Sequence, residues 1–377
     1  MGPERVDFDR PLRIAQISPL YESVPPQGYG GTERVVANLA DALVDLGHDV
    51  TLFASADACT NAHLVAGRER ALRLDPNPLK SDTAAHFAML HEIRKQRHAF
   101  DILHFHTDIL HFPFFEDVAA HTLTTMHGRL DIVDLHEVLC RWRQYPLASI
   151  SQHQRRPVSF ANWRGTVYHG IPTDLFAFSE HHRGTLAFLG RIAPEKRVDR
   201  AIEIARRAGM TLRIAAKVDD ADRVYFQEII EPQFDTHVDF IGEIGDFQKN
   251  ELLGSAAALL FPIDWPEPFG IVMIEAMACG TPVIAWDEGS VSEIIDDGVT
   301  GFIVRSIDEA VAAVNRVDML DRHTVRTTFE RRFAAAAMSN NYLRLYAEAL
   351  RPISRLTDNA ANRREIRASR GDRALRA

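Results

Sequence analysis

The amino-acid sequence predicts an α/β protein of two domains, each with a parallel sheet covered by helices. The chain has 377 residues, which is long enough to bury two hydrophobic cores. Residues 12–55 read as a strand, a glycine-rich loop, a helix and a second strand, which is the pattern of a βαβ unit. The same alternation starts again near residue 185, so we expect a second sheet of the same kind.

Turn residues at Gly170 and Pro172 mark the expected boundary between the domains. We therefore expect an N-terminal domain over residues 1–172 and a C-terminal domain over residues 173–335. Residues 336–357 are predicted to form a helix, and residues 358–377 are expected to form a disordered tail. The tail is basic, because residues 355–377 carry seven arginines against three acidic side chains.

The composition excludes several classes of protein. The net charge of −9 argues against general affinity for nucleic acid. Three widely spaced cysteines suggest neither a disulfide framework nor a zinc site, which favours a reducing cytoplasm. The charged start of the chain is unlike a signal peptide, and no apolar run reaches the length of a membrane span. We expect a cytoplasmic protein with at most peripheral membrane contact.

Residues 262–280, PIDWPEPFGIVMIEAMACG, predict a rigid loop followed by a short, mostly apolar helix. Three prolines exclude a regular helix before Gly270, and Gly280 followed by Thr-Pro is typical of a helix end. The free N–H groups at the start of such a helix carry a partial positive charge that suits phosphate. Glu267 precedes the helix and Glu275 lies within it, eight positions later. Eight residues of helix rise by about 12 Å. That is roughly the span from the sugar to the ribose of a nucleotide sugar, but the two acids alone favour an ordinary core helix with one glutamate at its solvent edge.

The string EPFGIVMIEAMACGTPVIA, residues 267–285, is much more specific. It resembles the Glu-x7-Glu region of the retaining glycosyltransferases of family 4. The resemblance implies the GT-B fold, in which two Rossmann-like domains face each other across a cleft and the last helix crosses back to the N-terminal domain. It also implies that the N-terminal domain binds the acceptor and the C-terminal domain binds a nucleotide sugar. The apolar face of the crossing helix would consist of Tyr342, Leu343, Leu345 and Tyr346.

Eight residues are expected to hold the donor. By the resemblance, Glu267 would orient the sugar as a catalytic residue, and Glu275 would bind the ribose. Arg191 and Lys196 lie in the string GRIAPEK between a strand and a helix, where two fixed cations can neutralise a leaving diphosphate. Further diphosphate contacts are expected from the helix start and from the first glycine-rich loop, at Phe269, Gly270, Ile271 and Gly31.

His127 is the histidine with the clearest expected role. It precedes Gly128 at the end of a predicted strand, and in the resembled family a histidine at this place lies beside the donor sugar and the reacting centre. His104 and His106 alternate along the preceding strand and therefore share one face. No third side chain has the spacing of a metal ligand, so no metal site is predicted. We expect these two histidines to lie near an acceptor pocket or to be packed in the interior.

The resemblance implies a retaining transferase that moves glucose or another hexose by substitution on one face of the sugar. UDP-glucose is the default donor, and GDP- and ADP-sugars are the alternatives. Neither a metal nor a cofactor is expected, because fixed cations already lie where negative charge develops. The acceptor cannot be identified from the sequence, and a small metabolite such as a pterin, a lipid and a glycan all remain open.

Three other functions fit parts of the pattern. A nucleotide-sugar epimerase on the same fold would need an acid–base pair that the motifs do not supply. A glycan-binding module without turnover would not need Arg191, Lys196, Glu267 and Glu275 together. A nicotinamide dehydrogenase would need the full dinucleotide fingerprint, and the glycine-rich loop at residues 28–33 lacks its third glycine.

Overall fold

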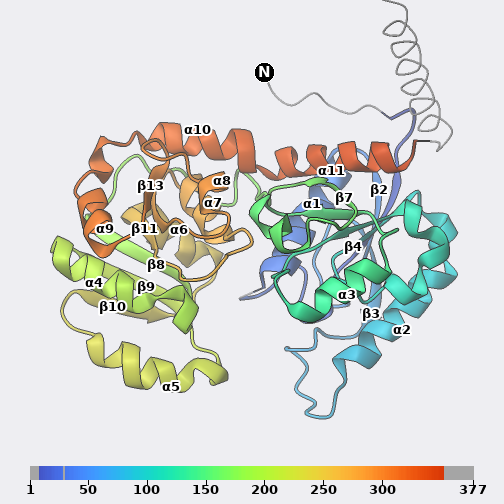
Figure 1. Cartoon of the computed structure of the whole chain (residues 1–377), viewed down its shortest axis with the longest axis horizontal. Helices are drawn as coiled ribbons and strands as arrows, with labels where there is room; N and C mark the ends of the chain where they lie inside the picture. The colour runs from blue at the N-terminus through green and yellow to red at the C-terminus, as the bar shows by residue number, and fades with distance from the viewer. Residues whose placement is uncertain (1–7, 29, 352–377) are drawn as a thin grey trace, which may run out of the picture.

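The computed structural model describes residues 8–28 and 30–351. Two α/β domains lie side by side, and two consecutive helices run along both of them (Figure 1). The predicted basic tail, residues 358–377, lies outside the described residues. Within the described part of the chain, no helix combines the length and the apolar character needed to cross a membrane.

The N-terminal domain is built on a seven-stranded sheet of order β3-β2-β1-β4-β5-β6-β7, in which all neighbouring strands are parallel. The central strand β1 is buried over all but its first residue, as expected where helices cover both faces. The two edge strands, β3 and β7, are absent from the prediction because their residues are half-buried or exposed and give no clear alternating or extended apolar pattern. The strands are β1 (Arg13–Ile17), β2 (Asp49–Ser55), β3 (His63–Arg68), β4 (Ile102–Phe105), β5 (Thr122–Thr125), β6 (Leu147–Ser149) and β7 (Trp163–Thr166), and the α-helices are α1 (Gly31–Asp45), α2 (Asp82–Lys95) and α3 (Val133–Arg141).

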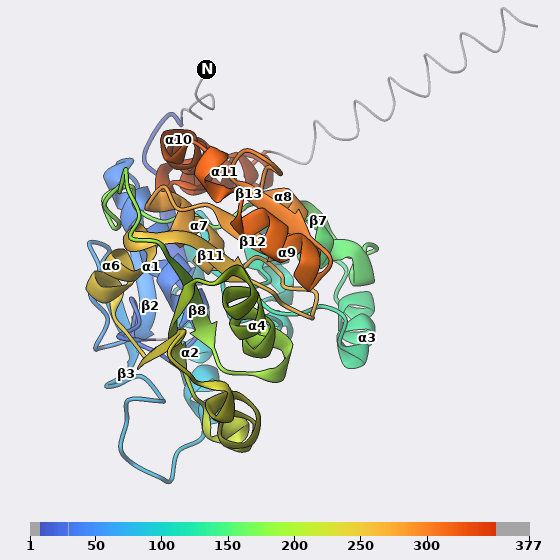
Figure 2. The same cartoon turned by 90° about the vertical axis from the view of Figure 1, so that its left-hand side faces the viewer.

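The C-terminal domain repeats this architecture with a six-stranded sheet of order β10-β9-β8-β11-β12-β13, again with parallel neighbours. Helices cover both faces of the sheet. Figure 2 shows α4 and α9 together on one side of it and α6 on the other. The strands are β8 (Thr185–Arg191), β9 (Thr211–Lys217), β10 (Val238–Gly242), β11 (Ala256–Phe261), β12 (Val283–Trp286) and β13 (Gly301–Val304), and the α-helices are α4 (Val198–Ala208), α5 (Arg223–Tyr225), α6 (Asp246–Ser255), α7 (Ile271–Ala278), α8 (Val291–Ile294) and α9 (Ile307–Val314).

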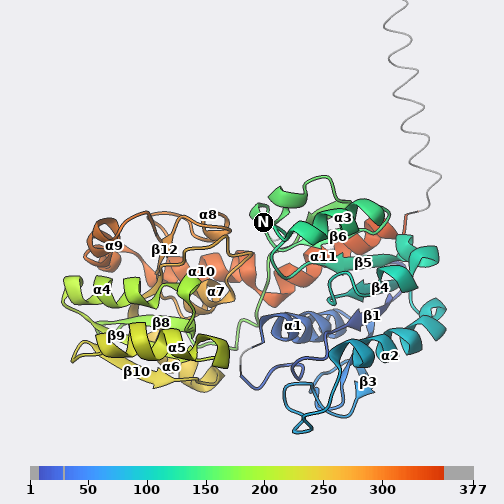
Figure 3. The same cartoon turned by 60° about the horizontal axis from the view of Figure 1, so that its bottom comes forward.

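The last two helices, α10 (Arg322–Phe333) and α11 (Ala335–Ala349), connect the two domains. Figure 3 shows α10 beside the C-terminal sheet and α11 beside the N-terminal sheet. The helix axis breaks at Ala334, where the backbone of Ile171 exchanges hydrogen bonds of 3.0 and 2.9 Å with Phe333 and Ala335. The predicted crossing helix is therefore present as far as Ala349, and residues 352–357 of its predicted range lie outside the described residues.

The apolar face predicted for the crossing helix is buried. Tyr342, Leu343, Leu345 and Tyr346 pack into the core of the N-terminal domain with side chains of α1 and β1. Burial of these side chains supplies a large part of the hydrophobic free energy that holds α11 in place, at about 25 cal/mol per Å² of apolar surface. The C-terminal end of the chain thus contributes to the core of the N-terminal domain.

In both sheets the strand order reverses beside the first strand, between β1 and β4 and between β8 and β11. Open α/β sheets bind their ligands at such reversal points, outside the carboxyl ends of the strands. The loops after β1, β4 and β5 and those after β8 and β11 leave these ends and meet in the space between the domains. The fold therefore places the expected ligand site in the cleft between the two domains.

Candidate active site

A cavity of about 490 Å³ lies between the domains, which is in the size range of cofactor and substrate pockets. The residues that line it come from the loops at the points where the strand order reverses in the two sheets. The structure brings eight of the nine predicted site residues to this cavity, and they are Gly31, His127, Arg191, Lys196, Glu267, Phe269, Gly270 and Ile271. Glu275 is the exception, because it does not line the cavity.

Two helices begin at the cavity, one from each domain. Gly31 is the first residue of α1 and Ile271 is the first residue of α7. They face each other closely, since a Cβ atom added at Gly31 would lie 3.6 Å from Cδ1 of Ile271. The first N–H groups of a helix have no acceptor within the helix and carry partial positive charge. An anion between the domains would therefore meet two positive helix ends.

The predicted helix of the motif is confirmed, and glycines define both of its ends. Gly270 has a φ of +81°, and a Cβ atom there would lie 2.8 Å from Cε of Met273, so no other residue fits without strain. At the other end Gly280 has a φ of +78°. The N–H groups of Gly280 and Thr281 donate to the carbonyls of Met277 and Ala276 at 2.9 Å, which is a Schellman motif.

The loop that precedes α7 is anchored from behind by Ser290. The Ser290 backbone N–H donates to the carbonyl of Glu267 at 3.0 Å, and its hydroxyl donates to the carbonyl of Phe269 at 2.8 Å. The Phe269 side chain is buried in the domain core and stacks edge-on against His169, at 4.8 Å between ring centres. The loop is thus rigid, and its backbone holds Glu267 at the cavity wall.

Lys196 and Glu267 form an ion pair within the cavity wall. Their side chains are only 15% and 13% exposed, so solvent screens the pair weakly. Trp265 supports both partners, because its indole N–H donates to Glu267 at 3.0 Å and its ring lies 4.6 Å below the Lys196 ammonium. The predicted phosphate-binding cation and the predicted sugar-binding acid therefore act as one unit.

Carboxylates fix the orientation of Arg191. Its guanidinium donates to Glu195 at 2.9 Å and to Asp219 at 3.4 Å. Lys217 shares Asp219 with it, at 3.1 Å. A ligand in the cavity would meet an arginine that is already oriented, although its charge is partly balanced by these acids.

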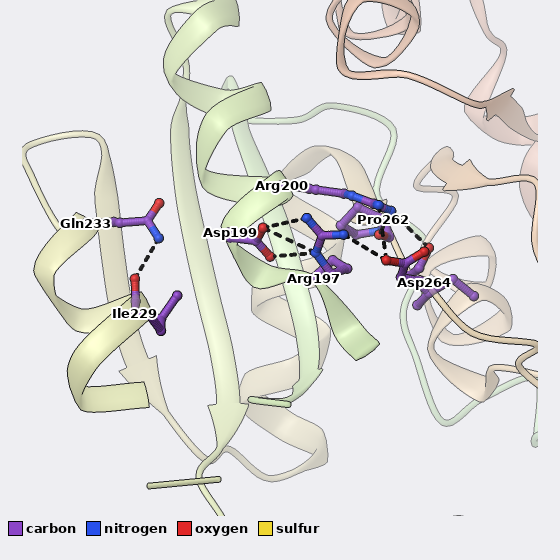
Figure 4. Close-up of polar contacts among 8 residues, drawn as sticks. Arg197, Asp199, Arg200, Ile229, Gln233, Pro262 and Asp264 are labelled. Atoms are coloured by element: carbon purple, nitrogen blue, oxygen red, sulfur yellow. Dashed lines mark hydrogen bonds and ion pairs between the residues drawn. The ribbon is translucent and has the colours of Figure 1, made fainter. Parts of the chain in front are cut away.

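A cluster of charged side chains outside the cavity joins the loop of Lys196 to the loop of Glu267 (Figure 4). Arg197 donates to Asp199 at 3.0 Å and to Asp264 at 2.8 Å, so it bridges the two loops. Arg200 adds a bond of 3.2 Å to Asp264 and one of 3.3 Å to the carbonyl of Pro262. This cluster sets the separation of the loops that carry the ion pair.

Glu275 lies within α7 and is buried, with 2% of its surface exposed. It accepts a hydrogen bond of 3.1 Å from Lys249 of α6, which compensates its charge. Lys249 also lies 3.5 Å from Asp246, and Asp246 pairs with Arg34 of the N-terminal domain at 2.8 Å. The expected contact of Glu275 with a ribose remains a prediction, and this acid already has a partner within the chain.

His127 lies at the N-terminal wall of the cavity, just after β5. Its Nε2 atom is 2.8 Å from Nδ1 of His106, and its ring stacks on that of His169 at 5.3 Å. Burial lowers the pKa of His127 to about 3 and holds the pKa of His106 and His169 well below the usual range. The imidazole rings are therefore neutral at physiological pH, and they act through hydrogen bonds rather than charge.

His104 and His106 differ in their surroundings although they share one strand face. His106 lines the cavity, whereas His104 is packed in the interior between Tyr346, at 2.7 Å, and Thr125, at 2.8 Å. Protein groups occupy both ring nitrogens of each histidine. The expected interior packing is thus found for His104, whereas the expected acceptor pocket near His106 stays a prediction.

Asp108 is a cavity residue that the sequence interpretation missed. It follows β4, lines the cavity and has a φ of +49°, which is a strained conformation for an aspartate. Solvent in the cavity reaches its side chain, but the protein around it raises the pKa of Asp108 to about 6 by burial. A hydrogen bond from the backbone N–H of His127 offsets only part of that rise. A lone aspartate after a strand gives no sequence signal, because its importance comes from its place at the cavity, which only the fold defines.

Two family models match the chain over most of its length. The model described as Glycosyltransferase Family 4 matches residues 29–173, and the model described as Glycosyl transferases group 1 matches residues 176–324. The division between them falls between the two sheets. The chain belongs to glycosyltransferase family 4.

Relatives of this family 4 glycosyltransferase match along nearly the whole chain. The phosphatidyl-myo-inositol mannosyltransferase of Mycobacterium tuberculosis is 24% identical over 390 residues, covering 89% of this chain and 96% of that protein. The mannosyltransferase of the same name from Mycolicibacterium smegmatis is 25% identical, covering 84% and 87% of the two chains.

Solved structures confirm the GT-B fold that the resemblance implied. AviGT4, a glycosyltransferase involved in avilamycin A biosynthesis, superimposes with a TM-score of 0.68 at 24% identity, covering 90% of this chain and 98% of that chain. HepE of Anabaena, solved in complex with UDP and glucose, gives a TM-score of 0.68 at 16% identity, with 89% and 100% covered. At these identities the likeness concerns the fold.

We predict that replacing Asp108 by asparagine stabilises this glycosyltransferase above pH 6. The raised pKa means that the folded protein holds the Asp108 carboxylate less favourably than the unfolded chain does. The loss of folding free energy caused by the charged Asp108 carboxylate is absent below its pKa in the unfolded chain, near 3.8. It is complete above its pKa in the folded protein, about 6. The difference in melting temperature between Asp108→Asn and the wild type should therefore be positive at pH 8 and should vanish near pH 3.5. The exposed Asp220, changed to asparagine, serves as the control, and a difference that does not depend on pH would contradict the prediction.

Proposed function

We propose that this enzyme transfers a hexose from a nucleoside-diphosphate sugar to an acceptor hydroxyl, with retention of the anomeric configuration. The observation that carries the proposal is the convergence of positive groups in one cavity. The helix start at Gly270, the ammonium of Lys196 and the guanidinium of Arg191 all face the space between the domains. Such an arrangement stabilises a diphosphate more strongly as it leaves, because its negative charge grows during the reaction.

In the proposed reaction, the bond between C1 of the sugar and the diphosphate oxygen breaks. A bond between C1 and the acceptor oxygen forms on the same face of the sugar. The acceptor proton passes to an oxygen of the departing diphosphate, so no protein nucleophile is needed. The cations and helix ends supply the stabilisation that a metal ion supplies in other transferases, and we propose that no metal takes part.

We propose that Glu267 binds hydroxyl groups of the sugar and thereby sets the position of C1. The support for this role is its place in the cavity wall, with one carboxylate oxygen held by Lys196 and Trp265. A carboxylate fixed in this way accepts hydrogen bonds in one geometry, which favours a single orientation of the sugar. His127 and Asp108 on the opposite wall would border the sugar and the acceptor.

We propose a UDP-hexose as the donor, with UDP-glucose as the default and GDP-mannose or an ADP-sugar as alternatives. The complex of HepE with UDP and glucose supports UDP-glucose, and the similarity to mannosyltransferases supports GDP-mannose. The proposed acceptor is a small metabolite, a lipid or a glycan that enters beside the N-terminal wall. We also propose that the reaction takes place in the cytoplasm.

Thermal shifts with UDP, GDP, ADP and NAD test the proposal. A nucleotide that binds only the folded protein adds about 2.7 kcal/mol of stability at a concentration of about 100 times its Kd. We expect a rise of the melting temperature with one of the three nucleoside diphosphates, and we expect Arg191→Ala to abolish it. Arg206→Ala, which removes an exposed arginine paired with Asp235 on the surface, should leave it unchanged. A shift with NAD alone would overturn the proposal.

A further inference from the structure

A chain of buried hydrogen bonds runs from the cavity to the crossing helix. His127 Nε2 lies 2.8 Å from His106 Nδ1, and His106 Nε2 lies 2.8 Å from Gln16 Oε1. The Gln16 amide then donates to the hydroxyl of Tyr346 at 3.0 Å. His106, Gln16 and Tyr346 are fully or almost fully buried, so water does not compete for these bonds. This series of hydrogen bonds connects the ends of β5 and β4 with β1 and α11, which belong to distant parts of the sequence.

The amide of Gln16 determines which atom donates and which accepts in each of these hydrogen bonds. Its N–H group is used on Tyr346, so its oxygen must accept a hydrogen bond from Nε2–H of His106. His106 is neutral, and a neutral imidazole that donates through one nitrogen must accept through the other. His106 Nδ1 therefore accepts, and the proton between the two histidines belongs to Nε2 of His127.

The remaining nitrogen of His127 is then a hydrogen-bond acceptor. Nδ1 of His127 is buried and has no hydrogen-bond partner among the described residues. A buried polar atom without a partner is costly, and such atoms are concentrated where function requires them. The stacked ring of His169 and the hydrogen bond to His106 leave the His127 ring little freedom to turn.

We infer that His106, Gln16 and Tyr346 are positioning residues that hold His127 at the cavity wall in its Nε2–H tautomer, which leaves Nδ1 as the remaining acceptor of the ring. The inference rests on the proposed function for the contact between His127 and the sugar. It also gives α11 a part in the active site, because Tyr346 reaches His127 through two intervening side chains.

Two tyrosines on α11 allow a matched comparison. Tyr346→Phe removes the hydroxyl that holds Gln16, and Gln16→Leu interrupts the chain one step closer to His127. Tyr342→Phe removes an equally buried hydroxyl of the same helix, which bonds to Thr125 at 2.9 Å. It does not lie between Tyr346 and His127, and it reaches Tyr346 only through Thr125 and His104. We expect Tyr346→Phe and Gln16→Leu to lower kcat by about 10- to 100-fold with little change in KM for the donor. Tyr342→Phe should retain the wild-type kcat.

Nitrogen-15 spectra of the histidine rings in the free protein give a second readout. His127 is assigned from the signals lost in His127→Asn. We expect a proton on Nε2 and none on Nδ1 in the wild type, and a mixture of tautomers in Gln16→Leu. A proton on Nδ1 of the wild type would overturn the inference, as would an equal loss of kcat in Tyr346→Phe and Tyr342→Phe. Failure of the proposed function is recognised separately, because the wild type would then not turn over any sugar nucleotide while the spectrum of the free protein would still report the tautomer.

Discussion

Replacing Lys196 by methionine is expected to lower kcat/KM for the sugar nucleotide by about 10²- to 10³-fold, the usual loss when one preorganised charge-stabilising group is removed. Methionine is an unbranched apolar side chain that removes the ammonium lying beside Glu267 and over the Trp265 ring. The departing diphosphate then loses a cation while Glu267 loses its partner. Steady-state rates of nucleotide release, measured across donor concentrations, check the result.

The control for Lys196 is Lys95→Met, which removes a lysine that is exposed on α2 and pairs only with Glu92 in the part of the chain described here. Its kcat/KM should stay within about twofold of the wild type, because exposed ion pairs contribute little. A Lys196→Met enzyme with wild-type kcat/KM would show that the diphosphate does not depend on this cation.

Glu267→Gln is expected to lower kcat by about 10²- to 10³-fold while nucleoside-diphosphate binding is retained. The amide keeps an oxygen that accepts from Trp265, so the loop should hold its shape. It loses the negative charge that Lys196 balances and that we propose orients the sugar hydroxyls. The nucleotide-induced thermal shift and kcat, measured on the same preparation, separate binding of the diphosphate from positioning of the sugar.

Glu203→Gln, an exposed change on α4, provides the matched control for Glu267. The double variant Lys196→Met/Glu267→Gln should lose less activity than the product of the two single losses, because Lys196 and Glu267 form one ion pair. Full activity of Glu267→Gln would remove this acid from the proposed site, and strict additivity would contradict the coupling.

The local structure around the motif could be predicted because glycine and proline act through their own backbone geometry. Gly270 and Gly280 both adopt positive φ values at the ends of α7, as their positions in the string indicated. The alternation of strands and helices likewise indicated two parallel sheets. The edge strands β3 and β7 escaped prediction because half-buried residues leave no clear apolar pattern.

The pairing of side chains could not be predicted, since it depends on how distant segments meet. Lys196 and Glu267 were expected to contact different parts of the donor, yet the fold joins them in one ion pair. The partner of Glu275, Lys249, comes from a neighbouring helix that carries no motif. The path from His127 to Tyr346 spans more than 200 residues, so only the packing of α11 against the first sheet reveals it.

The central claim is that the diphosphate of a sugar nucleotide binds between the two domains and leaves under the influence of Lys196, Arg191 and the start of α7. A crystal structure with the sugar nucleotide that gives the largest thermal shift tests this claim most directly. The account predicts a diphosphate within hydrogen-bonding distance of Lys196 and of the backbone N–H groups at Ile271, with the sugar between Glu267 and His127. A diphosphate bound outside the interdomain cavity, or one without contact to Lys196 and α7, would contradict it.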